Sequence, residues 1–160
     1  MQTDVRMAYV AGSGLLVTPT PARLKGLTVT SQTSSLRNMA VCDPSTSKSG
    51  TYSQTGTTIT CTIANHGLTN GQRVFIDCTT GTSRDGVYPI TYVDANTFTV
   101  SPANTVSTSG NVTMYPDMYV EIDTYSTVGL PIKIPGQGVY CKNGLYVGVG
   151  ASVTALVYYG

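Results

Sequence analysis

The only histidine of the chain, His66, lies among residues that could act with it in nucleophilic catalysis. A cysteine hydrolase needs a thiol, an imidazole base and an acid that orients the imidazole. The candidate thiols are Cys61 and Cys78, and the candidate acids are Asp77 and Asp94. Cys61, however, falls on the expected inward face of a strand, and its spacing to His66 matches no Cys–His protease signature. We therefore interpret Asn65-His66-Gly67 as a turn in which His66 caps a backbone group, and we expect no catalytic residue.

Metal and cofactor sites are equally poorly supported. The four cysteines are Cys42, Cys61, Cys78 and Cys141, and none forms a CxxC pair. With a single histidine to complete a site, a zinc centre is not expected, and we interpret the cysteines as small buried apolar residues. A Cys61–Cys78 disulfide would need neighbouring strands, and the absence of a signal peptide favours a reducing compartment of synthesis. Gly136-Gln137-Gly138 and Gly148-Val149-Gly150 open no helix, so neither predicts a phosphate site.

One pair of carboxylates has a spacing that chemistry could use. Glu121 and Asp123 are two apart, so they share one face of a strand. Such a pair could serve glycosidic cleavage or calcium binding. The sequence lacks the companions of either site, because it has no Trp for a sugar platform and no Asp-x-Asp-x-Asp loop. We interpret the pair as a solvated strand face.

The elements that must position these residues are β-strands. Only 11% of the residues are charged and 41% are hydrophobic, with Thr, Val, Ile and Tyr prominent. These types suit a pleated, half-buried surface, and short strands alternate with Gly, Pro, Asn and Asp turns without any helical apolar period. The net charge of +1 gives no field for nucleic acid, and no apolar run is long enough to cross a membrane. The N-terminus has no secretory signal pattern.

The strand pattern divides the chain into a frame and an insertion. The clearest alternation is in Thr58–Val100, and it extends to a compact unit within residues 51–115. Five strands are expected there, over residues 58–63, 73–78, 87–93, 97–100 and 111–115. The flanks 1–50 and 116–160 each hold too little core alone. The sequence therefore predicts an all-β chain: an outer β-sandwich, jelly-roll-like, from both flanks, with a small five-stranded β-barrel-like domain inserted.

Tyrosines near the C-terminus suggest a contact surface. The final strand, residues 152–159, is apolar on both faces, so it is either central in a sheet or covered by a partner. Tyrosine suits both cores and interfaces, and the two interpretations stay open. The candidate interface residues are Tyr140, Tyr146, Leu156, Tyr158 and Tyr159.

Two stretches resemble parts of bacteriophage virion proteins. The inner pattern Asn65-His66-Gly67-Leu68-x-x-Gly71 with Val93-Asp94-Ala95-Asn96-Thr97-Phe98 resembles a small β-domain of phage tail and virion proteins. The outer segments Asp4–Val10, Leu130–Val139 and Val153–Gly160 are similar to short virion proteins of phages, particularly cyanophages. The resemblance lies in turns that determine the fold. It implies a non-enzymatic structural protein of a phage particle.

The resemblance and the composition together rank four functions. Capsid decoration, in which the chain acts as a cement protein on the capsid surface, comes first. A neck or tail component, as adaptor or fibre base, comes second, a receptor- or carbohydrate-binding module third, and an enzyme last. The expected partners are the major capsid protein or other virion proteins, in a homo-oligomer for which a trimer is favoured. The expected location is the virion, after synthesis in the host cytoplasm. We expect the outer sandwich to dock and the inserted unit to point away.

Overall fold

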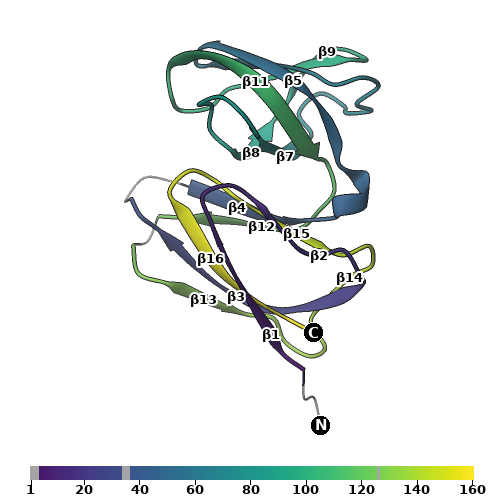
Figure 1. Ribbon diagram of the computed structural model, residues 1–160, viewed down its shortest axis with the longest axis vertical. Coiled ribbons are helices and arrows are strands. Elements are labelled where there is room, and N and C mark those ends of the chain that lie inside the picture. Colours follow the sequence, from purple (N-terminus) through teal and green to yellow (C-terminus); the bar gives the residue numbers. More distant parts are fainter. Residues whose placement is uncertain (1–3, 34–36, 126) are drawn as a thin grey trace.

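The computed structural model describes residues 4–33, 37–125 and 127–160, and its regular elements are almost entirely β-strands. The exception in this part of the chain is the short 3-10 helix η1 (Pro44–Thr46). The strands form two lobes, one above the other in Figure 1. The predicted all-β class, with a sandwich-like frame and a nearly closed barrel-like unit, is confirmed.

Two sheets build the outer lobe. The five-stranded sheet consists of β1 (Arg6–Ala11), β16 (Val153–Tyr159), β3 (Ala22–Ser31) and β13 (Leu130–Lys133) in that order, with β14 (Val139–Cys141) also paired to β3. The four-stranded sheet has the order β12 (Met118–Thr124), β4 (Arg37–Cys42), β15 (Leu145–Val149) and β2 (Leu15–Thr18). Residues from both ends of the chain meet in each sheet. The strand expected to begin at Leu36 starts here with Arg37, because Leu36 lies outside the described residues.

The core of the outer lobe lies between these two sheets. Its buried residues are Val10, Leu24, Leu27, Val29, Met39, Val41, Cys141, Leu145, Val147, Val149, Val153, Ala155 and Val157. Leu24 and Leu27 are both buried although they are three apart, which breaks the two-residue period of a strand. The pairing between β3 and β16 shifts register between Tyr158 and Tyr159, opposite Gly26 and Leu24. This β-bulge takes up the extra residue and returns Leu27 to the core.

Residues 48–115 build the other lobe, the inner unit, as a single sheet. Its order is β8-β7-β11-β5-β6-β10-β9. The strands are β5 (Lys48–Gly56), β6 (Thr58–Thr62), β7 (Arg73–Asp77), β8 (Gly86–Pro89), β9 (Thr91–Asp94), β10 (Thr97–Val100) and β11 (Val106–Tyr115). The two edge strands β8 and β9 are consecutive in the chain and are joined at Ile90, whose amide extends the β7–β8 pairing by donating to the Gln72 carbonyl (3.0 Å). Because the chain connects the two edges there, the sheet is nearly closed into a barrel.

The inner unit therefore has seven strands where five were predicted. Residues 87–93 divide at Ile90 into β8 and β9, and β5 precedes the first of the five expected strands. β5 was missed because Gln54 occupies an inward position where an apolar residue would signal a strand. Gln54 is buried, and its amide donates to the carbonyls of Gly56 (2.9 Å) and Asn104 (3.0 Å) while its oxygen accepts from Ser83 Oγ (2.6 Å). These bonds satisfy the buried amide.

The two lobes meet at a packed seam. Its buried residues are Ala40, Cys42, Phe75, Val87, Tyr115 and Tyr146. Alternate residues of β4 face opposite ways, so Met39 and Val41 enter the sandwich core while Ala40 and Cys42 enter the seam. The four-stranded sheet is therefore covered on both faces, whereas the five-stranded sheet has the inner unit on neither face (Figure 1).

Candidate functional site

His66 is a buried structural residue of its turn. Its Nδ1 accepts from the Leu68 amide (3.0 Å), so Nε2 carries the proton and donates to the Asp94 carbonyl oxygen (2.8 Å). The ring also makes edge contacts with Tyr92 and Phe98, at centroid distances of 5.8 and 5.2 Å. Both nitrogens are occupied by backbone groups. The interpretation of His66 as a turn residue that caps a backbone group is confirmed.

The thiols beside His66 are held in protonated form. Burial raises the pKa of Cys61 to about 12, and burial, followed by the neighbouring Asp85 carboxylate, raises that of Cys78 to about 12. A thiol is nucleophilic only as the thiolate, so neither sulfur is activated. All four cysteines are free. Cys61 lies on β6 and Cys78 directly follows β7, and these two strands are not neighbours in the sheet. The hydrolase arrangement is therefore not assembled around these residues.

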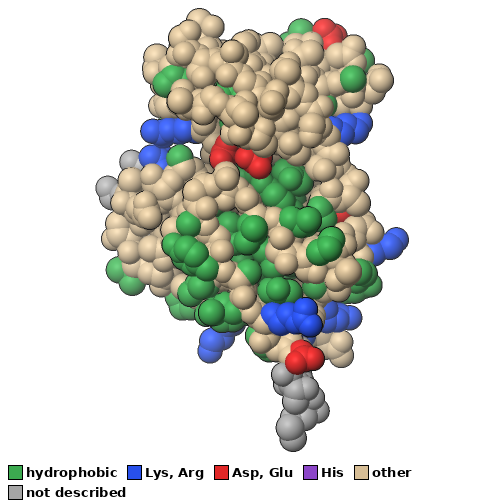
Figure 2. All heavy atoms as spheres, viewed as in Figure 1, with side chains coloured by type: hydrophobic (Ala, Val, Ile, Leu, Met, Phe, Trp, Pro, Cys, Tyr) green, Lys and Arg blue, Asp and Glu red, His purple; other side chains and the backbone are tan. Residues whose placement is uncertain are grey.

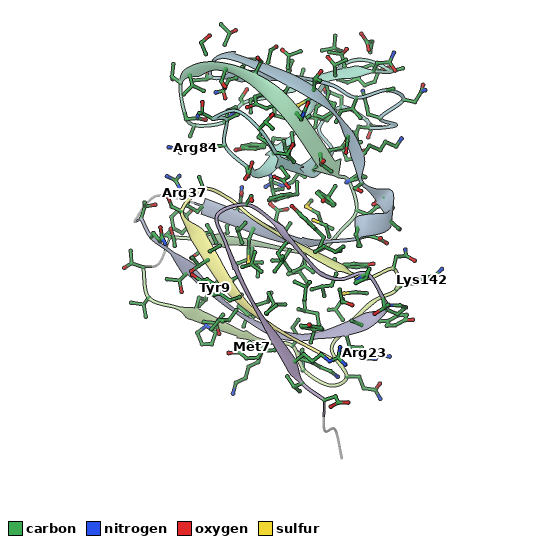
Figure 3. The ribbon with its side chains drawn as sticks, viewed as in Figure 1. Met7, Tyr9, Arg23, Arg37, Arg84 and Lys142 are labelled. Carbon is green, nitrogen blue, oxygen red and sulfur yellow. The ribbon has the colours of Figure 1, made fainter. Side chains whose placement is uncertain are left out.

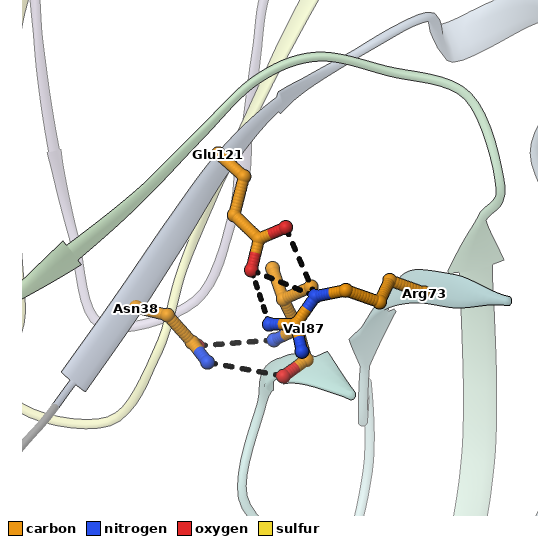
Figure 4. A network of polar contacts seen from close by, with 4 residues as sticks. All are labelled: Asn38, Arg73, Val87 and Glu121. Atoms are coloured by element: carbon orange, nitrogen blue, oxygen red, sulfur yellow. Dashed lines mark hydrogen bonds and ion pairs between the residues drawn. The ribbon is translucent and has the colours of Figure 1, made fainter. Parts of the chain in front are cut away.

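The two carboxylates on β12 have different surroundings. Glu121 accepts from Arg73 of β7, with the Arg73 Nε atom 3.1 Å from each carboxylate oxygen (Figure 4). Asp123 is exposed. The interpretation as a solvated face is therefore wrong for Glu121, which ties the outer lobe to the inner unit. Beside this pair, the side-chain amide of Asn38 on β4 donates to the Val87 carbonyl and accepts from the Val87 amide, both at 3.0 Å. It thus pairs with the Val87 backbone as the backbone of a neighbouring strand does.

A buried carboxylate also lies at the centre of the seam. Asp77 of β7 accepts from the Tyr146 hydroxyl of β15 (2.7 Å), and the Tyr146 ring stacks on Tyr115 with centroids 3.9 Å apart and planes at 12°. Burial, then the hydrogen bond to Asp77, raises the pKa of Tyr146 far above its usual range. Tyr146 thus remains the donor. The other carboxylate oxygen of Asp77 is buried without a hydrogen-bond partner.

Asp85 is a carboxyl group of the inner unit whose pKa is raised. Its carboxylate accepts from the Cys78 amide (2.7 Å). Burial raises the pKa of Asp85 to about 7, with a further contribution from Asp77. Asp85 lines a small hollow between the lobes with Arg37, Arg84 and Tyr88; Figure 3 labels the two arginines on either side of the seam. The charge state of this group therefore changes near neutral pH.

The structure separates the five predicted interface residues. Tyr146 is buried in the seam and contacts the chain's own inner unit, so its prediction as a contact for a partner is wrong. Tyr140 is 53% exposed and lies beside the Arg23 guanidinium, whose carbon is 5.2 Å from the ring centre. Leu156, Tyr158 and Tyr159 are half-buried. Leu156 and Tyr158 alternate with the core residues of β16 and so face outward, whereas Tyr159 follows the bulge and lines a hollow with Arg6 and Thr18.

The outward residues of the five-stranded sheet form two ordered rows, which we call the docking face. One row runs Met7, Tyr158, Gly26, Lys133 across β1, β16, β3 and β13. The next runs Tyr9, Leu156, Thr28, Pro131 over the same strands. Residues directly opposite each other share one face of a sheet. Gly26 leaves a groove of about 310 Å³ between Tyr158 and Lys133.

Met7 and Tyr9 belong to this face but were not among the predicted interface residues. Each is 62% exposed, and Figure 3 labels both along β1. Figure 2 looks onto the side where β1 lies, and hydrophobic side chains gather there on the outer lobe but hardly on the inner unit. Met7 and Tyr9 occupy alternate positions of β1, so their common face could be read from the sequence. The strand has only six residues, so this pattern was weak evidence for an exposed face.

Comparisons with known proteins assign no relative to the chain. No family model matches it, and neither the curated proteins nor the solved structures contain a match. Over residues 4–33, 37–125 and 127–160, no three His, Cys, Asp or Glu side chains come together as a metal site. The same part of the chain contains no helix of the length and apolarity that crossing a bilayer requires.

Proposed function

We propose that the chain is a non-enzymatic structural protein of a bacteriophage particle, and specifically a capsid decoration protein that binds and stabilises the shell. The observation that carries the docking role is the uncovered outer face of the five-stranded sheet, with Met7 and Tyr9 each 62% exposed. Exposed, contiguous apolar side chains on a sheet mark a contact surface. The phage particle itself comes from the sequence resemblance of the inner and outer segments.

The arrangement of the lobes supports this role. The inner unit packs on the four-stranded sheet, on the opposite side of the sandwich core from the docking face (Figure 1). A particle surface that contacts the docking face would leave the inner unit pointing outward. Surface-exposed threonine and serine dominate β5, as in its alternation of Ser49, Thr51, Ser53 and Thr55. Such a surface suits contact with solvent.

The number of copies in a particle tests the proposal. A decoration protein repeats with the shell lattice, so we expect on the order of hundreds of copies per purified virion by gel densitometry against the major capsid protein. A count of about six to twelve copies would instead indicate a neck or tail component, because these assemblies have low cyclic symmetry. Absence of the chain from purified virions would refute a virion role altogether.

A receptor- or carbohydrate-binding module is the second candidate, and one observation favours it. A hollow of about 290 Å³ beside Tyr92 is lined by Asn65, His66, Gly67, Leu68, Tyr92 and Ala95. It lies near β9, at the end of the inner unit far from the outer lobe (Figure 1). An exposed aromatic ring beside a polar turn can stack on a sugar. Saturable binding on a glycan array that is lost in Tyr92→Ala, but kept in Tyr125→Ala, would favour this function over decoration.

A further inference from the structure

The docking face carries an uneven distribution of charge. None of the five strands of its sheet contains an acidic residue. Three cations face outward on it: Arg23 beside the exposed Tyr140 ring, and Lys25 and Lys133 at the groove over Gly26. The Lys25 ammonium is positioned by the Gln137 carbonyl, to which it donates at 2.7 Å. The face thus combines an apolar side over β1 and β16 with a positive rim over β3 and β13.

The acidic residues of the chain lie off the docking face, and Asp4, which precedes β1, lines the hollow with Arg6 and Tyr159 at the end of the sheet. Asp77 and Asp85 are in the inner unit near the seam, and Glu121 is paired with Arg73. Asp43 is buried at the junction of the lobes, where it accepts from Tyr119 and Asn143. The whole chain has a net charge of only +1. The positive sign is therefore a local property of this face, which points to a partner of opposite sign.

A second copy of the chain does not fit this face in the commonest symmetric arrangement. In a twofold contact both surfaces would be this same face, whose strands contain no acidic residue, so Arg23, Lys25 and Lys133 would meet no carboxylate. Cations enclosed in a contact without partners of opposite sign oppose binding. The occupant must instead supply carboxylates that the face itself lacks.

We infer that the docking face binds a protein surface with an apolar area and, beside it, an acidic rim, which under the proposed function belongs to the capsid shell. Met7, Tyr9 and Leu156 fill the apolar part of the contact, and tyrosine and methionine are enriched at protein interfaces. Arg23, Lys25 and Lys133 pair with carboxylates at its edge. The inference names the chemistry of the partner and rests on the proposed function for its identity.

The same observations disfavour a nucleic acid or a bilayer as the occupant. Binding to phosphate chains scales with the number of Lys and Arg contacts, and the docking face offers three. The apolar rows beside those cations would remain uncovered by phosphates. A charged bilayer gains about 1 kcal/mol for each basic residue near its surface, so three cations hold a protein there only weakly. A protein surface can supply both apolar side chains for the two rows and carboxylates for the cations of the rim.

Zero-length cross-linking in purified virions tests the inference directly. A carbodiimide joins a lysine amine to a carboxylate in a direct amide bond and takes up the water released. Because no spacer is inserted, only groups that touch each other are linked. The chain has four lysines, Lys25, Lys48, Lys133 and Lys142, of which the first and third lie on the docking face. We expect Lys25 and Lys133 to link to Asp or Glu of a shell protein, and Lys48 to form no such link.

A matched pair of variants gives a second readout. Lys25→Glu/Lys133→Glu reverses the rim, whereas Lys48→Glu/Lys142→Glu makes the same change of net charge elsewhere. Each pair removes one lysine that donates to a backbone carbonyl, because Lys48 donates to the Asn65 carbonyl as Lys25 does to Gln137. With empty shells of the major capsid protein as probe, we expect the first pair to lose about tenfold or more in affinity and the second to stay within about threefold. Thermal melts confirm that both variants are folded.

The outcomes separate failure of the inference from failure of the proposed function. Absence of the chain from virions refutes the proposed function. A virion-borne chain that cross-links to the shell only through Lys48 or Lys142 refutes the inference alone. Equal binding to a DNA duplex or to phosphatidylserine vesicles would show an unspecific polyanion surface and also refute it, as would self-association that Lys25→Glu/Lys133→Glu abolishes.

Discussion

Tyr146 holds a buried carboxylate at the seam, and its hydroxyl has a measurable structural role. Tyr146→Phe removes the 2.7 Å bond to Asp77, which leaves a buried carboxylate without that donor. We expect a loss of about 2–3 kcal/mol in the free energy of unfolding, because the hydrogen bond involves a charged acceptor. Urea unfolding measures the loss, and Tyr140→Phe, at an exposed ring, should change it by less than about 0.5 kcal/mol. An unchanged midpoint for Tyr146→Phe would show that the bond does not stabilise the seam.

His66 joins two backbone groups of the inner unit through its ring nitrogens. His66→Ala removes a buried ring and leaves the Leu68 amide and the Asp94 carbonyl without their side-chain partner. We expect about 2–4 kcal/mol of destabilisation in chemical unfolding. Binding to capsid shells at a temperature where the variant is folded should be unchanged. Loss of a hydrolytic activity in this variant would contradict the non-enzymatic role.

The Asp85 carboxyl group makes stability depend on pH in a defined window. Its folded pKa of about 7 lies above the value of an exposed aspartate, mainly because of burial. The folded chain therefore binds more protons between about pH 4 and pH 7, so this group's contribution to stability falls as pH rises through that window and is level above it. Asp85→Asn keeps an acceptor for the Cys78 amide but cannot ionise. We expect Asp85→Asn to be more favourable for stability at pH 8 than at pH 4 by about 3–4 kcal/mol, because each pKa unit corresponds to about 1.4 kcal/mol.

Unfolding curves of wild type and Asp85→Asn at several pH values supply this comparison. Asp43 serves as the contrast, because burial acts to raise its pKa but hydrogen bonds from Ser45, Asn143 and Tyr119 outweigh burial and keep it low. Its contribution is lost only in acid, as pH falls through that lowered pKa. If the difference in the free energy of unfolding between wild type and Asp85→Asn is the same from pH 4 to pH 8, the account is contradicted.

Roles that depend on neighbouring residues in the sequence could be predicted, whereas roles that depend on distant residues could not. His66 between Asn65 and Gly67 indicated a turn, because turn chemistry is local. The partner of Tyr146 could not be predicted, because Asp77 lies 69 residues away and meets it only across the seam. The rim of Lys25 and Lys133 was equally hidden, since β3 and β13 become neighbours only in the folded sheet.

At the scale of elements, the seam depends on close approach of two strands. Gly148 of β15 faces Phe75 of β7, and a Cβ atom at Gly148 would lie 2.3 Å from the Phe75 ring. Phe75 is fully buried, so the ring has little freedom to yield. We expect Gly148→Ala to destabilise the chain by about 1–3 kcal/mol through overpacking. Thermal or urea unfolding measures this change.

A second substitution separates overpacking from other effects of Gly148→Ala. In a Phe75→Leu background the smaller side chain gives the new methyl group room, so the added cost of Gly148→Ala should shrink. A double-mutant cycle over the four proteins gives the coupling. Independent, additive effects of the two substitutions would show that the strands do not press on each other there.

The elements show why strands were easier to predict than their partners. The alternation in β6, β7, β10 and β16 was read correctly because one face of each is apolar and buried. The Asn143-Gly144 pair is a sequence typical of a hairpin turn, yet β14 pairs with β3 and β15 with β4, so this turn crosses between sheets. The final strand β16 is central, between β1 and β3, and its second face is uncovered. Pairing depends on long-range contacts that local pattern does not contain.

At the scale of the whole molecule, the two ends of the chain together form the outer lobe. Both sheets of that lobe combine strands from before and after residues 48–115. The inner unit packs on the four-stranded sheet, and the five-stranded sheet is left with its outer face exposed. Under the proposed function, one lobe contacts the particle while the other extends from it. The apolar flanks and the compact middle were visible in the sequence, but the face that remains uncovered emerges only from the packing of the lobes.

A cryo-electron microscopy map of the phage particle, resolved well enough to trace strands, tests the central claim most directly. We expect the docking face, with Met7, Tyr9, Leu156 and Tyr158, to lie against shell protein at repeated lattice positions, with acidic shell residues near Lys25 and Lys133. The inner unit should project away from the shell. A map in which the inner unit contacts the shell and the five-stranded sheet faces solvent would contradict the account.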